Sequence, residues 1–130
     1  MKRLIFVLFL FVGISAIAQD YSNTLLSGWT ITKDTTIDRK FSSDYDWAIQ
    51  VKTASQTGTT NSYVKIFHKI SGMDWVLYDV NAIDTCNTAN YSHIFIGNDM
   101  IADSLRVAFY KNGVTGGTLT IKMNAFKNKR

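Results

Sequence analysis

The stretch YVKIFHKISGMDWVLYDV, residues 63–80, contains two apolar-rich segments on either side of a short turn. Val64, Ile66 and Ile70 fall on one face of the first segment if it is an extended strand, and we expect that face to pack in a core. His68 shares this face, where a lone histidine is more often packed than catalytic. The opposite face carries Tyr63, Lys65, Phe67 and Lys69.

The turn itself predicts a β-hairpin. Residues 71–74, Ser-Gly-Met-Asp, have a suitable length, because Gly72 adopts a positive φ without strain and the polar side chains can satisfy local backbone groups. Residues 75–80 then form the returning strand. The serine and the aspartates of this stretch are therefore explained by a turn and do not require an active site.

The rest of the chain repeats this pattern of short strands and turns. All ten acidic residues are aspartate and none is glutamate, which disfavours long helices and favours turns. Seven short strands without helical crossovers predict an all-β fold, either a small antiparallel β-sandwich of jelly-roll or immunoglobulin-like type or a small barrel. Residues 81–90 read as a loop, and we expect Phe126 to close the core. The expected strands are residues 29–32, 47–52, 63–70, 75–80, 91–96, 105–110 and 119–123.

The first 18 residues match a secretory signal peptide. Lys2 and Arg3 form a positive n-region, an apolar run follows, and Ala16-Ile17-Ala18 is a small-x-small cleavage site. The apolar run is shorter than the roughly 20 residues that span a bilayer. We therefore expect cleavage after Ala18, secretion to the periplasm or the medium without a stable membrane span, and a single folded domain over residues 19–130.

Charge and cysteine content restrict the partners. Without Lys2 and Arg3 the chain carries 12 basic and 10 acidic residues, and the basic ones are scattered, which argues against a nucleic-acid partner. Cys86 is the single cysteine, so an intramolecular disulfide is not possible. The fold must be held by core packing, although a lone thiol could also form an intermolecular bond.

Catalytic motifs are lacking in the sequence. Nucleophilic catalysis needs a serine or cysteine beside an oriented base, and neither His68 nor His93 lies in such a motif. We expect no enzyme activity and no cofactor. Zinc-binding spacings are also absent, whereas calcium has weak candidates, because four aspartates crowd one region and calcium accepts carboxylate oxygens. These aspartates are Asp34, Asp38, Asp44 and Asp46.

Aromatic residues are the best sign of a binding site. The chain has more of them than one small core needs, and several fall on the strand face opposite the aliphatic one. An exposed aromatic face could stack on sugar rings or form a protein interface. The predicted binding residues are Trp75, Tyr78, Phe67 and Tyr63.

Two motifs carry a resemblance to known modules. The Ser-Gly-x-Asp-Trp turn at residues 71–75 and the Gly-Gly-Thr-Leu-Thr-Ile strand at residues 116–121 resemble the small β-sandwich modules of phage virion proteins, and similar sandwiches occur among carbohydrate-binding modules. The resemblance covers residues 47–123. The signal peptide also resembles those of exported Bacteroidota proteins. No functional residue is carried over, because Gly72 precedes Asp74 here, whereas the usual order places Asp and Gly together ahead of the tryptophan.

Two functions are consistent with these observations. The first is an exported, non-catalytic β-sandwich that binds glycan or protein at the cell surface or in the medium. The alternative is a structural subunit of a virion or an extracellular assembly. The chain has no proline, which removes one common way to keep edge strands from pairing, so self-assembly is a further expectation.

Overall fold

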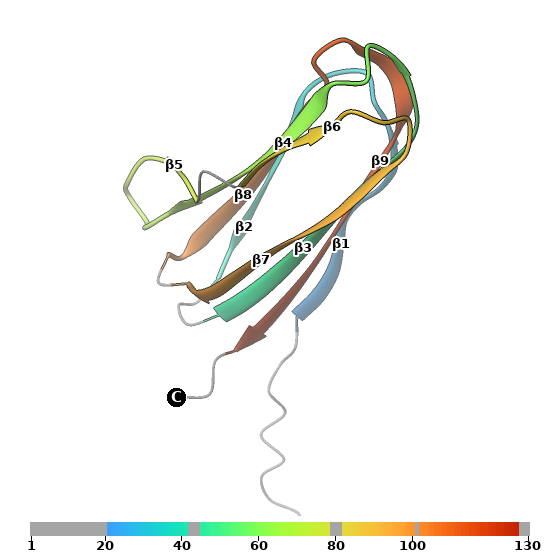
Figure 1. The fold of residues 1–130 in the computed structure, drawn as a ribbon. Coiled ribbons are helices and arrows are strands. Elements are labelled where there is room, and N and C mark those ends of the chain that lie inside the picture. Colours follow the sequence, from blue (N-terminus) through green and yellow to red (C-terminus); the bar gives the residue numbers. More distant parts are fainter. Residues whose placement is uncertain (1–20, 42–44, 79–81, 101, 128–130) are drawn as a thin grey trace, which may run out of the picture.

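The computed structural model describes residues 21–41, 45–78, 82–100 and 102–127. Nine antiparallel strands form two sheets that pack against each other (Figure 1), so the predicted β-sandwich is confirmed. The strands are β1 (Tyr21–Thr30), β2 (Thr35–Lys40), β3 (Tyr45–Gly58), β4 (Ser62–Lys69), β5 (Val76–Leu77), β6 (Ile83–Cys86), β7 (Tyr91–Met100), β8 (Ser104–Tyr110) and β9 (Val114–Lys127).

The strand order mixes segments that are distant in the sequence. The four-stranded sheet has the order β1-β9-β3-β7, and the five-stranded sheet has the order β2-β8-β4-β5, with β6 paired to another part of β4. Because β9 lies between β1 and β3, it joins the start of the folded region to its middle. All of these pairings are antiparallel, as the lack of crossover helices predicted.

Strands β2 and β6 do not overlap any expected strand, and β1 overlaps the expected strand at residues 29–32 only at Trp29 and Thr30. Strand β2 contains Asp38, Arg39 and Lys40 and only one apolar residue, so its composition is typical of a loop. Its pairing with β8 places Asp38 opposite Arg106, and their ion pair compensates for the polar sequence. Strand β6 has four residues and lies inside the segment that we expected to be a loop.

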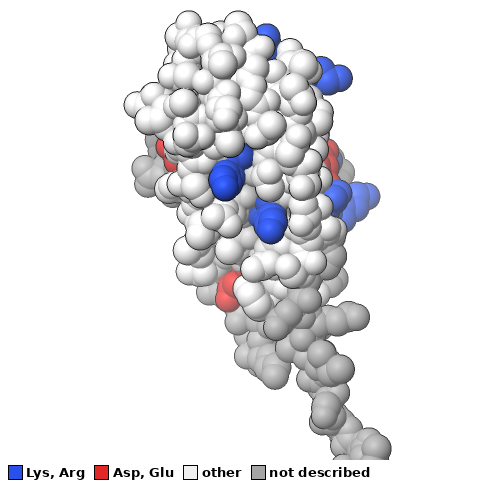
Figure 2. All heavy atoms as spheres, turned by 90° about the vertical axis from the view of Figure 1, so that its right-hand side faces the viewer, with Lys and Arg blue, Asp and Glu red and all other residues white. Residues whose placement is uncertain are grey.

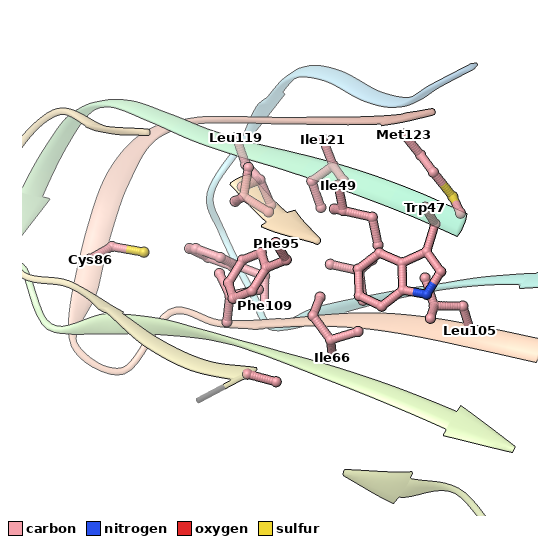
Figure 3. Packing of buried hydrophobic residues seen from close by; sticks show 14 of the residues in the cluster. Trp47, Ile49, Ile66, Cys86, Phe95, Leu105, Phe109, Leu119, Ile121 and Met123 are labelled. Carbon is pink, nitrogen blue, oxygen red and sulfur yellow. The ribbon is translucent and has the colours of Figure 1, made fainter. Parts of the chain in front are cut away.

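The core lies between the two sheets. Figure 3 shows Leu119, Ile121 and Met123 from the four-stranded sheet and Ile66, Leu105 and Phe109 from the five-stranded sheet filling this space around Trp47. The expected burial of Val64 and Ile66 is confirmed.

Two core predictions are wrong. Ile70 is 59% exposed, because β4 ends at Lys69 and Ile70 already belongs to the turn. Phe126 is 46% exposed, because the alternation of β9 directs Ala125 into the core and Phe126 to the outer face.

The predicted hairpin at residues 71–74 is present in a shorter form. Gly72 has a φ of 82°, as the turn requires, and the Met73 amide donates a 2.9 Å hydrogen bond to the carbonyl of Ile70. The returning strand, β5, has two residues instead of the expected six. Leu77 pairs with Phe67, so the hairpin register is fixed although the strand is short.

One polar network is buried near the end of β3. The Gln56 side chain is 4% exposed; its Nε2 donates to the Thr53 hydroxyl at 2.8 Å and to the Thr88 carbonyl at 3.1 Å. Its Oε1 accepts a 2.7 Å hydrogen bond from the Ser62 hydroxyl. The Gln56 amide thus connects β3 with β4 and with the loop before β7. These hydrogen bonds fix the relative positions of the three segments more specifically than apolar packing would.

Candidate binding face

The outer face of the five-stranded sheet collects the side chains that alternate away from the core. On β4 these are Tyr63, Lys65, Phe67 and Lys69, because Val64 and Ile66 point inward. On the neighbouring β8 they include Arg106 and Tyr110, which are opposite Phe67 and Tyr63 in the strand register. Three aromatic residues and one cation from distant segments thus become cross-strand neighbours.

Tyr63 and Tyr110 form an aromatic pair at one end of this face. Their ring centroids are 4.7 Å apart and their planes differ by 15°, which is a stacked arrangement. The Lys65 ammonium lies 5.4 Å from the centroid of Tyr63 and 5.5 Å from that of Tyr110. Both rings are half-buried, so the pair is a partly exposed aromatic cluster with a positive charge beside it.

Trp75 lies over the same face near its other end. The Arg106 guanidinium carbon is 4.2 Å and the Lys69 ammonium 4.7 Å from the centroid of the Trp75 ring. Arg106 is held in place by a bidentate ion pair with Asp38, in which both hydrogen bonds are 2.7 Å long. The hydrogen bond from Arg106 lowers the pKa of Asp38, and the same bond raises the pKa of Arg106.

These side chains form a continuous row across two strands and the β4–β5 hairpin. We call this row the aromatic–cationic face; its residues are Tyr63, Lys65, Phe67, Lys69, Trp75, Arg106 and Tyr110.

Three of the four predicted binding residues belong to the aromatic–cationic face, and Tyr78 does not. The Tyr78 ring packs edge-on against Trp47, with centroids 5.1 Å apart, and against His68, with centroids 5.6 Å apart. Tyr78 therefore lies on the inner side of the sheet. The same contact shows that His68 is packed against an aromatic ring, as its position on the Val64 and Ile66 face suggested.

A small cavity lies where the sandwich edge opens beside β7. It has a volume of about 170 Å³, and Trp47, Tyr78, His93 and Phe95 are among the residues that line it. The indole Nε1 of Trp47 is buried and has no hydrogen-bond partner. The Trp47 ring lies directly above Gly97, its cross-strand partner, at a place where no other residue type would leave room.

Asp84 connects the two sheets close to this cavity. The Tyr91 hydroxyl donates a hydrogen bond to its carboxylate, and the His93 Nδ1 is 3.3 Å from the same oxygen. Burial, followed by the contact with Asp84, raises the pKa of Tyr91. This cluster ties the edge of β7 to β6, and we assign it a structural role.

Cys86 is fully buried beside this cluster. Burial raises the pKa of its thiol to about 11, against an ordinary value of 9.0, despite a hydrogen bond with Ser62 that acts in the opposite direction. The thiolate is thus disfavoured in the folded state and accessible only after unfolding. A buried, protonated thiol is a poor nucleophile and a poor partner for intermolecular disulfides.

The raised pKa of Cys86 makes stability depend on pH in alkaline solution. Below pH 9 the thiol is protonated in both states, whereas between pH 9 and 11 it ionises only in the unfolded chain, so folding stability falls as pH rises. At pH 10 this loss should be about 1 kcal/mol relative to pH 8. Urea unfolding of the wild type and of Cys86→Ala at both pH values checks this. An equal loss in the two proteins would contradict the assignment.

Two of the predicted calcium residues are directed to other partners. Asp34 accepts a 2.9 Å hydrogen bond from the Lys111 amide, and Asp38 is paired with Arg106. Asp46 lies on β3, and Asp44 is outside the described residues. Within residues 21–41, 45–78, 82–100 and 102–127, no group of three or more His, Cys, Asp or Glu side chains is arranged to hold a metal ion.

Charge is not concentrated on the opposite side of the molecule. Figure 2 shows the side on which β1 and β9 lie in Figure 1, and its Lys and Arg side chains are separated by uncharged surface. The cations that lie over aromatic rings belong instead to the five-stranded sheet. The aromatic–cationic face therefore differs from the side in Figure 2 in having cations that lie over aromatic rings.

No family model matches the chain, and a search of curated proteins finds no match either. The predicted signal peptide, residues 1–18, lies outside the described residues. The described part of the chain has no helix of the length and apolarity that crossing a membrane would take.

Proposed function

We propose that the chain is an exported, non-catalytic β-sandwich module that binds a glycan, or a protein surface, through the aromatic–cationic face. The observation that carries the proposal is the row of rings on one outer sheet face, from the stacked Tyr63 and Tyr110 to Trp75. Flat rings on a rigid sheet suit stacking against the apolar faces of sugars. Strand register places Tyr63 and Tyr110, and contacts with Lys69 and Arg106 hold Trp75, so little conformational freedom is lost on binding.

The cations refine the proposed ligand class. Lys65, Lys69 and Arg106 each lie within 6 Å of a ring, so a ligand on these rings would also meet positive charge. Asp38 neutralises part of the charge of Arg106. A glycan with carboxylate or sulfate groups, or an acidic protein surface, fits this combination better than a neutral polymer.

Two features support the absence of catalysis. Cys86 is fully buried, so its thiol cannot reach a substrate. His68 is packed against the ring of Tyr78. We also propose that the chain is secreted, because residues 1–18 match a signal peptide.

The proposal predicts that Trp75→Ala and Tyr63→Ala weaken binding while the protein stays folded. Retention on immobilised acidic and neutral polysaccharides should fall about tenfold for each variant, because each removes one stacking ring worth roughly 1.4 kcal/mol. Phe126→Ala is the matched control, since Phe126 is an exposed aromatic residue on the other sheet. Unchanged retention of both variants on every glycan tested, together with unchanged binding to acidic proteins, would overturn the proposal.

The alternative function, a structural subunit of a virion or extracellular assembly, has a different observation in its favour. Strand β7 is an edge strand with no described pairing partner on its outer side, and this edge could pair with another chain. It belongs to the other sheet from the aromatic–cationic face.

A further inference from the structure

Three of the four sheet edges are protected from pairing with another chain. Strand β1 has register shifts between Thr24 and Leu26 and between Leu26 and Trp29, and such irregularities disturb an edge. Strand β2 carries three consecutive charged residues, Asp38 to Lys40. The remaining edge consists of β5 and β6, which have two and four residues. Bulges, charges and short strands are the usual devices against edge-to-edge association.

Residues 91–97 of strand β7 lack these devices, and the one register shift and the one charged residue of the strand, Asp99, lie beyond Gly97 at its end. The strand has ten residues, and its pairing with β3 is regular from Trp47 opposite Gly97 to Thr53 opposite Tyr91. Residues 91–98, YSHIFIGN, contain no Lys, Arg, Asp, Glu or Pro. Among the described residues, no strand pairs with the other side of β7. No described strand therefore occupies the outward backbone groups of this uncharged segment, residues 91–98.

The side chains of β7 add an apolar stripe to this open edge. Ile94 is 50% exposed and Ile96 is 66% exposed, both on the outer face of the four-stranded sheet. Phe95 lies between them and points into the core, where it is 6% exposed. An edge strand that combines free backbone groups with exposed β-branched residues has the properties of a pairing site.

We propose that β7 pairs antiparallel with β7 of a second copy of this chain, which joins two four-stranded sheets into one continuous sheet. A strand pairs with its own copy through a two-fold axis, and side chains that face each other must lie on the same side of the sheet. Because side chains alternate along the strand, two residues that face each other are an even number of positions apart. The residue at the two-fold axis therefore faces the same residue of the other copy. With Phe95 at that position, Ile94 of each copy faces Ile96 of the other.

This register is the one that places the exposed isoleucines of the two copies opposite each other. Moving the axis to Ile94 or to Ile96 would leave one isoleucine of each copy opposite Ser92 or Asn98. With the axis at Phe95, four isoleucines form one apolar cluster, and His93 faces Gly97 without a steric conflict. Like charges do not face each other anywhere within residues 91–98, which makes the strand complementary to itself.

The oligomeric state in solution tests the pairing. Light scattering of the purified protein should show a dimer that forms as concentration rises. Ile94→Lys together with Ile96→Lys should weaken dimerisation at least tenfold, because each lysine would face another lysine across the axis. Phe126→Lys is the control, since β3 separates β9 from β7 and Phe126 is similarly exposed on the same sheet face.

The possible results distinguish association through the β7 edge from association through another surface. A monomer at every accessible concentration would overturn the proposal, and β7 would then be open to a strand from another protein. A dimer that survives the two β7 lysines but is lost in Phe126→Lys would also overturn it, in favour of association through the sheet face.

Cross-linking tests the register. The variant with both Ile94→Cys and Ile96→Cys should form an intermolecular disulfide on mild oxidation, whereas Ile94→Cys alone should form little, because the two Ile94 positions do not face each other. The native Cys86 is buried and does not interfere. Faster cross-linking of the single variant than of the double variant would overturn the Phe95-centred register.

Discussion

Gly97→Ala should destabilise the protein by about 3 kcal/mol or more and lower its melting temperature by about 10 °C or more. A Cβ atom at this position would lie 2.2 Å from Cε2 and 2.3 Å from Cζ2 of Trp47, where ordinary contacts begin near 3.4 Å. The indole is 2% exposed and enclosed by both sheets, so it cannot move away without disturbing the core. Thermal unfolding followed by circular dichroism measures the effect.

A control variant and a double variant test whether the clash with Trp47 causes the loss of stability in Gly97→Ala. Gly72→Ala places a Cβ in open space, and its positive φ costs only about 1 kcal/mol. If the ring contact is responsible, Trp47→Leu should destabilise the wild type but recover part of the stability lost in Gly97→Ala, which gives a favourable coupling in a double-mutant cycle. Additive effects of the two substitutions would show that the loss at Gly97 has another origin.

Gln56→Ala should have the second largest effect, a loss of about 3 kcal/mol. The substitution leaves the hydroxyls of Thr53 and Ser62 and the carbonyl of Thr88 without the partners that the amide provides. Each unsatisfied buried group costs about 1–3 kcal/mol, with relaxation reducing the total. Urea unfolding gives the free energy directly.

Comparison with two other glutamine variants separates hydrogen bonding from packing. Gln56→Met retains most of the side-chain volume, so it should be nearly as unstable as Gln56→Ala if hydrogen bonds dominate. Gln50→Ala removes an exposed amide with one 3.2 Å bond to Ser92 and should change stability by less than about 0.5 kcal/mol. A stable Gln56→Met protein would show that the network contributes little beyond its volume.

The β-sandwich was predictable because most strands carry a period of two. Residues 63–69 illustrate this, since Val64 and Ile66 point inward while Tyr63 and Lys65 point outward. Strand β2 has only one apolar residue, and it is held by its pairing with β8 and by the ion pair between Asp38 and Arg106, which are 68 positions apart. A single-sequence pattern cannot include a partner at that distance.

The binding face could be predicted only in part, for the same reason. Tyr63, Phe67 and Trp75 were identifiable as aromatic residues near one hairpin, but their neighbours Tyr110 and Arg106 come from β8. The register that brings Tyr110 opposite Tyr63 is a tertiary property. Tyr78 is an aromatic residue of the same hairpin, but it follows the short β5 and its ring packs against Trp47.

Because β9 lies between β1 and β3, the four-stranded sheet cannot be completed until β9 is available. Tyr45 pairs with Lys127 and Gly58 with Val114, so the largest strand pairing in the molecule joins partners far apart in the sequence. Such contacts form slowly, because a long loop must close before they are made. Until β9 has been synthesised, β1 lacks its pairing partner and β3 has only β7. If the chain is exported as proposed, its four-stranded sheet would stay incomplete until β9 has left the secretion channel.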